Sequence, residues 1–292
     1  MSHELVGLFA AMAPLGSAAG GEGPLRDWLA SHLMEQGADV STDALGNLLA
    51  RAGGGGPLVL CALDEPTFFA TGTGHEGRGV VASGTALGLE VLSGRRVRSA
   101  GGHEALLQAR AGELLLDPLS GLPEVGEAFT FAQERRAVEG ALVGPDAGRR
   151  SLICAVLAAL KWRVDFTLLG LARAGFSPQG GQDLLLRSGC SRGVALDLLE
   201  EEDEHKVGCG PVLLARSSRY VAPERMRGLF GTGRQTAVRP ELRSLAARLQ
   251  PAGIEGLGIC LPVRYLGGDQ ERIAYQDVEG LRELLKEALA PS

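Results

Sequence analysis

The chain has 292 residues, 45% of them apolar, and a formal net charge of −6, which suits one large domain plus a small one. A mildly acidic chain lacks the basic face that nucleic acid or anionic lipid requires, so we expect neither partner. No apolar run approaches the roughly 20 residues of a membrane span, and the first residues do not resemble a signal peptide. The five dispersed cysteines suit a reducing compartment, so we expect a cytoplasmic protein.

The first 65 residues predict two helices followed by a buried strand. Residues 5–12 have the apolar spacing of a helix, and a second helix begins at Pro24, because proline is favoured in a first turn. The apolar run 57–63 then ends in Asp64 and Glu65. This pattern is typical of a strand that is buried on both faces and carries polar residues at its carboxyl end.

The middle of the chain has a different pattern. From residue 66 to 143, short β-type runs alternate with glycine and polar turns, which predicts a small inserted β-domain. The predicted strands cover residues 67–71, 79–82, 87–92, 114–116 and 128–131.

From residue 144 onward, strands alternate with helices, which predicts a mostly parallel sheet covered on both faces. The predicted helices are 151–160, 181–188, 240–249 and 277–289, and the predicted strands are 164–171, 194–199, 211–215 and 259–265. We therefore expect an α/β domain made of residues 1–65 and 144–292, interrupted by the β-domain of residues 66–143.

Two glycine motifs fit active-site patterns but stand in the wrong context. Residues 72–77 fit GxGxxG, yet a strand-like segment follows where dinucleotide binding needs a helix. Residues 189–193 fit GxSxG, but the predicted order is helix, turn, strand, and no histidine follows His205 to serve as the base. We interpret both as loops. His75 and His103 each precede a glutamate in the inserted domain, which leaves a metal site there as a weaker alternative.

A series of short segments then matches a known family in order. They are the turn 16–22, Asp-Ala-Leu-Gly-Asn-Leu at 43–48, Ala-Leu-Asp-Glu at 62–65, Arg150 with 154–157, the strand 194–197, Gly-Cys-Gly-Pro-Val at 208–212, Leu-Pro-Val-Arg-Tyr at 261–265 and Gln-Asp-Val at 276–278. In this order, and with the inserted domain between the third and the fourth, they resemble nearly end to end the cytosolic metallo-aminopeptidases of the glutamyl aminopeptidase, cellulase M-like and tetrahedral (TET) type.

The resemblance implies two zinc ions at the carboxyl ends of the sheet strands. A bridging Asp, two His and two further carboxylates hold them, and a free Glu acts as general base. Carried over by position, the first His falls on Ala62, the bridging Asp near Gly148 with Asp146 as the nearest acid, the Glu pair on Ala172-Arg173, and the last His on Gly267. Most of the ligand set is therefore missing.

Two carboxylates of the family pattern remain. Asp197 corresponds to an acidic metal ligand, and Asp64 to the Asp that orients the first His. Because zinc usually has three or four protein ligands, we interpret both as vestigial and expect no bound cofactor, although the family holds zinc. We expect Arg173, which is permanently positive, to pair with Asp64 or Asp197 in place of the metal. Arg173 and Arg264 are our candidates for contacting a peptide or small-molecule ligand in the cleft.

These expectations favour a non-catalytic aminopeptidase homologue with a binding or structural role. The alternative is an active aminopeptidase or other hydrolase with a rearranged metal site, since a fold does not fix a function. An assembly subunit that accompanies an active paralogue is a third possibility. The resemblance also implies self-assembly with contacts through the inserted domain, so we expect a homo-oligomer.

Overall fold

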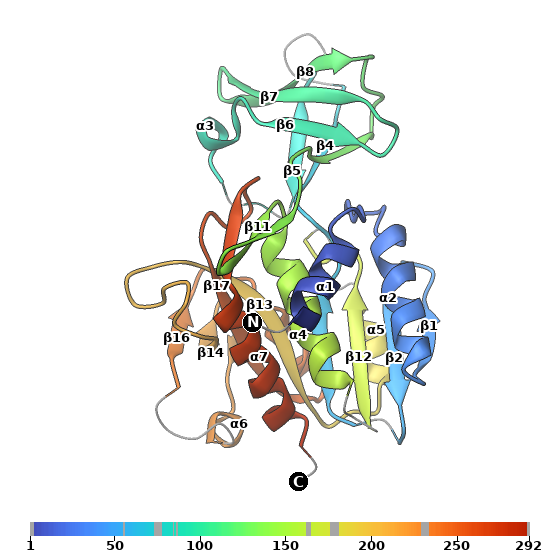
Figure 1. The fold of residues 1–292 in the computed structure, drawn as a ribbon, viewed down its shortest axis with the longest axis vertical. Coiled ribbons are helices and arrows are strands. Elements are labelled where there is room, and N and C mark those ends of the chain that lie inside the picture. The colour runs from blue at the N-terminus through green and yellow to red at the C-terminus, as the bar shows by residue number, and fades with distance from the viewer. Residues whose placement is uncertain are drawn as a thin grey trace.

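The computed structural model describes residues 3–54, 56–72, 78–83, 85, 87–161, 165–175, 181–228 and 234–290. Figure 1 shows a large sheet with helices packed against it, and a smaller β unit that stands above one end of that body. The predicted GxGxxG motif and His75 lie outside the described residues, apart from Gly72.

Nine strands form the main sheet, in the order β1-β2-β12-β3-β13-β17-β14-β15, with β16 beside β14. Their bounds are β1 Asp39–Thr42, β2 Leu48–Ala52, β3 Leu58–Ala62, β12 Phe166–Leu171, β13 Arg192–Glu200, β14 Val212–Ser217, β15 Tyr220–Val221, β16 Thr236–Arg239 and β17 Glu255–Val263. The central strands β12, β3, β13 and β17 pair in parallel, whereas β1, β2, β14 and β15 join them through antiparallel pairs. The predicted α/β class is confirmed, with parallel pairing concentrated at the centre of the sheet.

The helices cover the faces of this sheet. They are α1 His3–Met12, α2 Gly23–Glu35, α4 Ala147–Leu160, α5 Gln182–Arg187, α6 Glu224–Gly228 and α7 Tyr275–Ala288. Helix α4 lies between α1 and α7 (Figure 1), and every residue of it except Arg149 is buried. Strands β3 and β12 are buried along their whole length, as their continuous apolar runs predict. Among the described helices, none has the length and apolar character needed to cross a membrane.

Two predicted elements are wrong. The expected helix 240–249 is instead two 3₁₀ turns, η2 Leu245–Arg248 and η3 Gln250–Ala252, because Ser244 caps the first and proline opens the second. The predicted strand 87–92 contains the helical turn α3 Leu89–Leu92. Strands β6 and β7, described next, were not among the predicted ones.

The inserted segment forms a separate six-stranded sheet in the order β5-β4-β9-β6-β7-β8. Its strands are β4 Thr67–Ala70, β5 Val80–Ser83, β6 Arg96–Ser99, β7 Glu104–Arg110, β8 Glu113–Ser120 and β9 Ala128–Phe131. It has its own apolar cluster, in which the rings of Phe68 and Phe131 pack edge to face with their centroids 5.1 Å apart. The next strands, β10 Arg136–Val138 and β11 Ala141–Gly144, pair instead with β18 Glu271–Ala274, close to α7.

Candidate functional site

The two predicted aspartates lie at the carboxyl edge of the main sheet, where parallel strands end. The register aligns Ala195 of β13 with Leu60 of β3, so Asp197 is level with Ala62. Asp64 follows two residues after the end of β3. The fold therefore brings both carboxylates to one edge, as the sequence predicts, and that edge of an open α/β sheet is where ligand sites occur.

Asp64 belongs to a buried ionic cluster centred on Arg149 of α4. The Arg149 Nη1 atom lies 3.5 Å from Asp64 Oδ1, and its Nε lies 3.7 Å from Asp146 Oδ1. Only 18% of the Arg149 side chain is exposed. Although burial alone lowers the pKa of Arg149, the carboxylates of Asp146 and Asp64 outweigh it and raise that pKa. A fixed cation thus stands between two of the carboxylates at the sheet edge.

Further charged pairs extend this cluster along the start of α4. Arg150, which is fully buried, places its Nε 3.3 Å from Asp146 Oδ2 and its Nη2 4.0 Å from Glu65 Oε1. Arg135 forms an ion pair with the other oxygen of Glu65. We call Asp64, Glu65, Asp146, Glu271, Arg135, Arg149 and Arg150 the ionic cluster.

Glu271 of β18 is the fourth acid of the ionic cluster, and sequence reasoning did not identify it. Its two oxygens accept hydrogen bonds from the backbone N–H groups of Gly148 at 2.8 Å and Gly267 at 2.7 Å. Burial raises the pKa of Glu271 to about 8, and the charge of Asp146 adds to the shift. Burial also raises the pKa of Asp146, to about 6, against the lowering effect of Arg149 and Arg150. Burial therefore favours the neutral form of both acids, and more strongly that of Glu271.

Asp197 accepts its hydrogen bonds from neutral donors, while the charges of Arg248 and Arg149 also act on it and lower its pKa in part. The Ser244 hydroxyl donates to Asp197 Oδ2 at 2.5 Å, and the Leu245 N–H donates to the same oxygen at 3.1 Å. Burial raises the pKa of Asp197, and these two hydrogen bonds lower it in part. The carboxylate therefore caps the η2 turn.

The predicted pairing of Arg173 with Asp64 or Asp197 is wrong. Arg173 is exposed, has a φ of 51°, and donates its backbone N–H to Glu22 Oε1 at 2.8 Å. This conformation fixes the turn after β12, and Asp64 pairs with Arg149 instead. The tandem Arg149-Arg150 just after Asp146 was the signal available in the sequence, because charged residues at the start of an apolar helix need buried partners.

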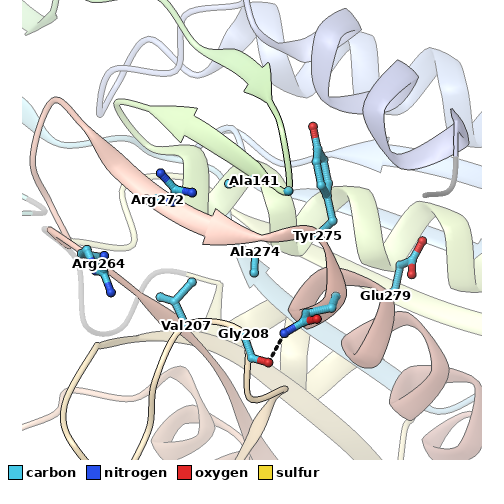
Figure 2. A pocket seen from close by; sticks show the side chains of 10 residues that line it. Ala141, Val207, Gly208, Arg264, Arg272, Ala274, Tyr275 and Glu279 are labelled. Carbon is cyan, nitrogen blue, oxygen red and sulfur yellow. Dashed lines mark hydrogen bonds between the residues drawn. The ribbon is translucent and has the colours of Figure 1, made fainter.

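Arg264, the other predicted binding residue, lies in a different place. Its guanidinium pairs with Glu201, with Nη2 3.0 Å from Oε1, and this carboxylate raises the pKa of Arg264. Arg264 lines a hollow beside β18 (Figure 2). No ion pair or hydrogen bond joins it to Asp64 or Asp197 in the described part of the chain.

The described residues do not fit the dinuclear zinc site that the resemblance implies. A Cβ atom at Gly148 would lie 2.7 Å from Leu198 Cδ1, and one at Gly267 would lie 2.9 Å from the Thr85 hydroxyl. Side chains at these two ligand positions would thus collide with their neighbours. Of the histidines, His32 stacks on Trp28, His103 pairs with Glu127 and His205 contacts Gln235. Over the described ranges, no three His, Cys, Asp or Glu residues converge as a metal would require.

No family model matches this sequence, and no curated protein matches it either. Solved structures do resemble the chain. An aminopeptidase from the archaeon Desulfurococcus kamchatkensis superposes with a TM-score of 0.87 at 17% identity, over 99% of this chain and 95% of that one. The TET1 peptidase of Pyrococcus horikoshii superposes with a TM-score of 0.83 at 18% identity, over 99% of this chain and 100% of that one. A TET aminopeptidase from a marine-sediment thaumarchaeote superposes with a TM-score of 0.86 at 15% identity, over 99% of this chain and 97% of that one. The chain thus has the fold of metallo-aminopeptidases of the TET type.

Proposed function

We propose that this chain is a catalytically degenerate member of the aminopeptidase fold, in which the guanidinium of Arg149 supplies the positive charge that zinc supplies in active enzymes. The observation that carries the proposal is the position of Arg149, within 4 Å of both Asp64 and Asp146 at the carboxyl edge of the sheet. A guanidinium carries a permanent charge but has no open coordination position, so it activates no water.

The charges of the ionic cluster support this reading. Three carboxylates (Asp64, Glu65 and Asp146) face three guanidiniums (Arg135, Arg149 and Arg150), and burial favours the neutral form of the fourth acid, Glu271. A divalent ion added to this balanced set would bring uncompensated positive charge into a mostly buried site, which is strongly unfavourable. The cluster therefore favours a structural role over metal binding.

Metal content and activity test this proposal together. The purified chain is loaded with zinc, desalted, measured by elemental analysis and assayed for release of N-terminal residues from a mixed peptide library, with and without chelator. We expect zinc well below one ion per chain and no chelator-sensitive release. Near-stoichiometric zinc together with release that the chelator abolishes would instead establish the alternative, an active hydrolase with a rearranged metal site.

We also propose that the chain forms a homo-oligomer through residues 66–143. The TET1 peptidase of Pyrococcus horikoshii assembles into a tetrahedron or a large octahedral shell. In the present chain, Leu119 is exposed at the end of β8, and Leu122 and Val125 are exposed on the loop that follows, at 81% and 75%. Exposed apolar patches often mark interfaces between subunits. Light scattering should show an oligomer that Leu122→Asp weakens, whereas an unchanged monomer would refute this part of the proposal.

The same proposal includes the kind of ligand that the chain binds and the cellular compartment in which it is found. We propose that its ligand is a peptide or small molecule bound at the carboxyl edge of the main sheet, where ligand sites occur in this class of fold. A cytoplasmic location fits the cysteines, because all five are free and three of them are buried.

A further inference from the structure

A hollow of about 670 Å³ opens beside the short sheet β10-β11-β18, within the size range of small-ligand pockets. Ala141 and Ala274 form its floor, and Val207 lies on one side. Figure 2 shows Arg264 and Arg272 toward one end, away from Tyr275 and Glu279. None of these residues belongs to the ionic cluster, so the hollow is a separate feature from the degenerate zinc centre.

Strand pairing places three arginines in one row on this sheet. Arg264 and Arg272 lie opposite each other across an antiparallel bridge, where each backbone N–H donates to the other's carbonyl at 3.1 and 3.0 Å. Arg272 is aligned with Val143 of β11, and Val143 with Arg136 of β10. Residues directly opposite in antiparallel strands project to the same face. We call Arg136, Arg272 and Arg264 the arginine row.

The floor of the hollow continues from the arginine row. Two residues further along the strands, Ala274 is aligned with Ala141, and Ala141 with Val138. Because side chains repeat on one face every second residue, these three lie on the same face as the arginines. The surface thus has a cationic edge and a flat apolar floor beside it.

The charges of the arginine row are only partly compensated. Like charges directly opposite in a sheet are destabilising. Glu201 neutralises Arg264, but among the residues that the structure describes, no ion pair involves Arg272 or Arg136. Guanidinium groups bind carboxylates and phosphates through parallel hydrogen bonds, so an oxyanion is the ligand that would neutralise Arg272.

We propose that this hollow binds a small organic oxyanion, a carboxylate or phosphate monoester on a short apolar body. Arg272 is its main partner, and Arg136, which lies beyond Val143 in the same row and outside the lining of the hollow, contributes its charge from further away. The apolar body of the ligand packs on Ala274 and Val207, which are both partly exposed. This site does not depend on the absence of peptidase activity.

Calorimetric titration of the full chain tests the proposal with three probes: phenyl phosphate, phenylacetate and inorganic phosphate. We expect saturable binding of phenyl phosphate, phenylacetate or both, tighter than that of inorganic phosphate because the ring rests on the apolar floor. The stronger organic probe identifies whether the natural anion is a phosphate or a carboxylate. Arg272→Gln should weaken that binding about tenfold or more, since charge-assisted bidentate hydrogen bonds are among the strong ones. Arg136→Gln should weaken it less.

The matched control is Arg110→Gln. Arg110 is exposed at the end of β7 in the other sheet, so this variant loses the same charge without touching the hollow. Its affinity should equal that of the wild type, and circular dichroism confirms that each variant folds. Equal affinities in Arg272→Gln and Arg110→Gln, or no saturable binding of either organic probe at millimolar concentration, would overturn the proposal.

Discussion

Asp64 and Asp197 lie at the same edge of the main sheet, but the protein satisfies their carboxylates in different ways. Asp64 faces the guanidinium of Arg149 and accepts from the Gly175 N–H at 2.9 Å. Asp197 instead accepts from the Ser244 hydroxyl and the Leu245 N–H. Removing the charge of a buried group is costly when it leaves an opposite charge unpaired. The cost is smaller when the group accepts its hydrogen bonds from neutral donors. The two sides of this sheet edge should therefore respond differently to substitution.

The largest effect is expected from Arg149→Leu. This change leaves Asp64 and Asp146 without their shared cation, and removing one partner of a buried ion pair costs about 3–5 kcal/mol. Urea unfolding followed by circular dichroism measures the loss. Arg149→Lys is the control, because it keeps the positive charge and should lose clearly less. Equal losses in the two variants would show that packing, and not charge, determines the role of Arg149.

Glu271 should make the stability of the chain depend on pH. Folding raises the pKa of this carboxyl from 4.5 to about 8, so the folded protein keeps a proton that the unfolded chain releases. Its contribution to stability is complete below pH 4.5 and is lost as the pH rises toward 8.

Glu271→Gln should remove this dependence. Between pH 5 and 8, the wild type should lose about 2–4 kcal/mol more stability than the variant. The variant also loses a pH-independent hydrogen bond, because an amide offers one acceptor to the two N–H groups of Gly148 and Gly267. Urea midpoints at four pH values give the two slopes. Parallel slopes would mean that Glu271 is ionised throughout.

The next largest effect on the free energy of unfolding is expected when the two aspartates are substituted and compared. Asp64→Asn removes a charge that faces Arg149 and should cost about 2–3 kcal/mol. Asp197→Asn keeps an oxygen for the Leu245 N–H and an amide that donates to Ser244, so it should cost about 1 kcal/mol or less. The same unfolding assay measures both variants. The comparison fails if Asp197→Asn is the more destabilising of the two.

The smallest effect is expected on the exposed side of the molecule. Arg264 pairs with Glu201 at the surface, and its side chain is 48% exposed. Arg264→Gln should change the free energy of unfolding by about 0.5 kcal/mol or less, because solvent screens such a pair. A loss comparable to that of Asp64→Asn would place Arg264 in the structural core of the site.

The sequence predicts five strands of the main sheet, β3, β12, β13, β14 and β17, because long apolar runs mark them, but it does not predict β1, β2, β15 or β16. The run before Asp64 and the strand containing Asp197 have continuous apolar patterns, and both appear as β3 and β13. The stretch 240–249 has helical spacing, but Pro251 and Gly253 follow it, and the segment forms short 3₁₀ turns. Strands β6 and β7 escaped prediction because arginines and glutamates interrupt their apolar pattern.

The candidate site was predictable only in part. Local sequence identifies positions of the resembled ligand pattern that carry no donor side chain, such as Ala62 and Gly267. It does not show which arginine lies beside Asp64, because Arg149 directly follows the expected bridging-Asp position at Gly148 and Arg173 stands at one of the expected Glu positions. Only the fold distinguishes them: Arg149 points from a buried helix, and Arg173 lies in an exposed turn. Glu271 is far from every other member of the ionic cluster in sequence, so no local pattern identified it.

The most direct test of the account is a crystal structure of the zinc-soaked chain, with diffraction data collected at the zinc absorption edge. The account predicts continuous density for the Arg149 guanidinium between Asp64 and Asp146, and no anomalous peak there. Two anomalous peaks at that position, with Arg149 turned away from both carboxylates, would contradict it.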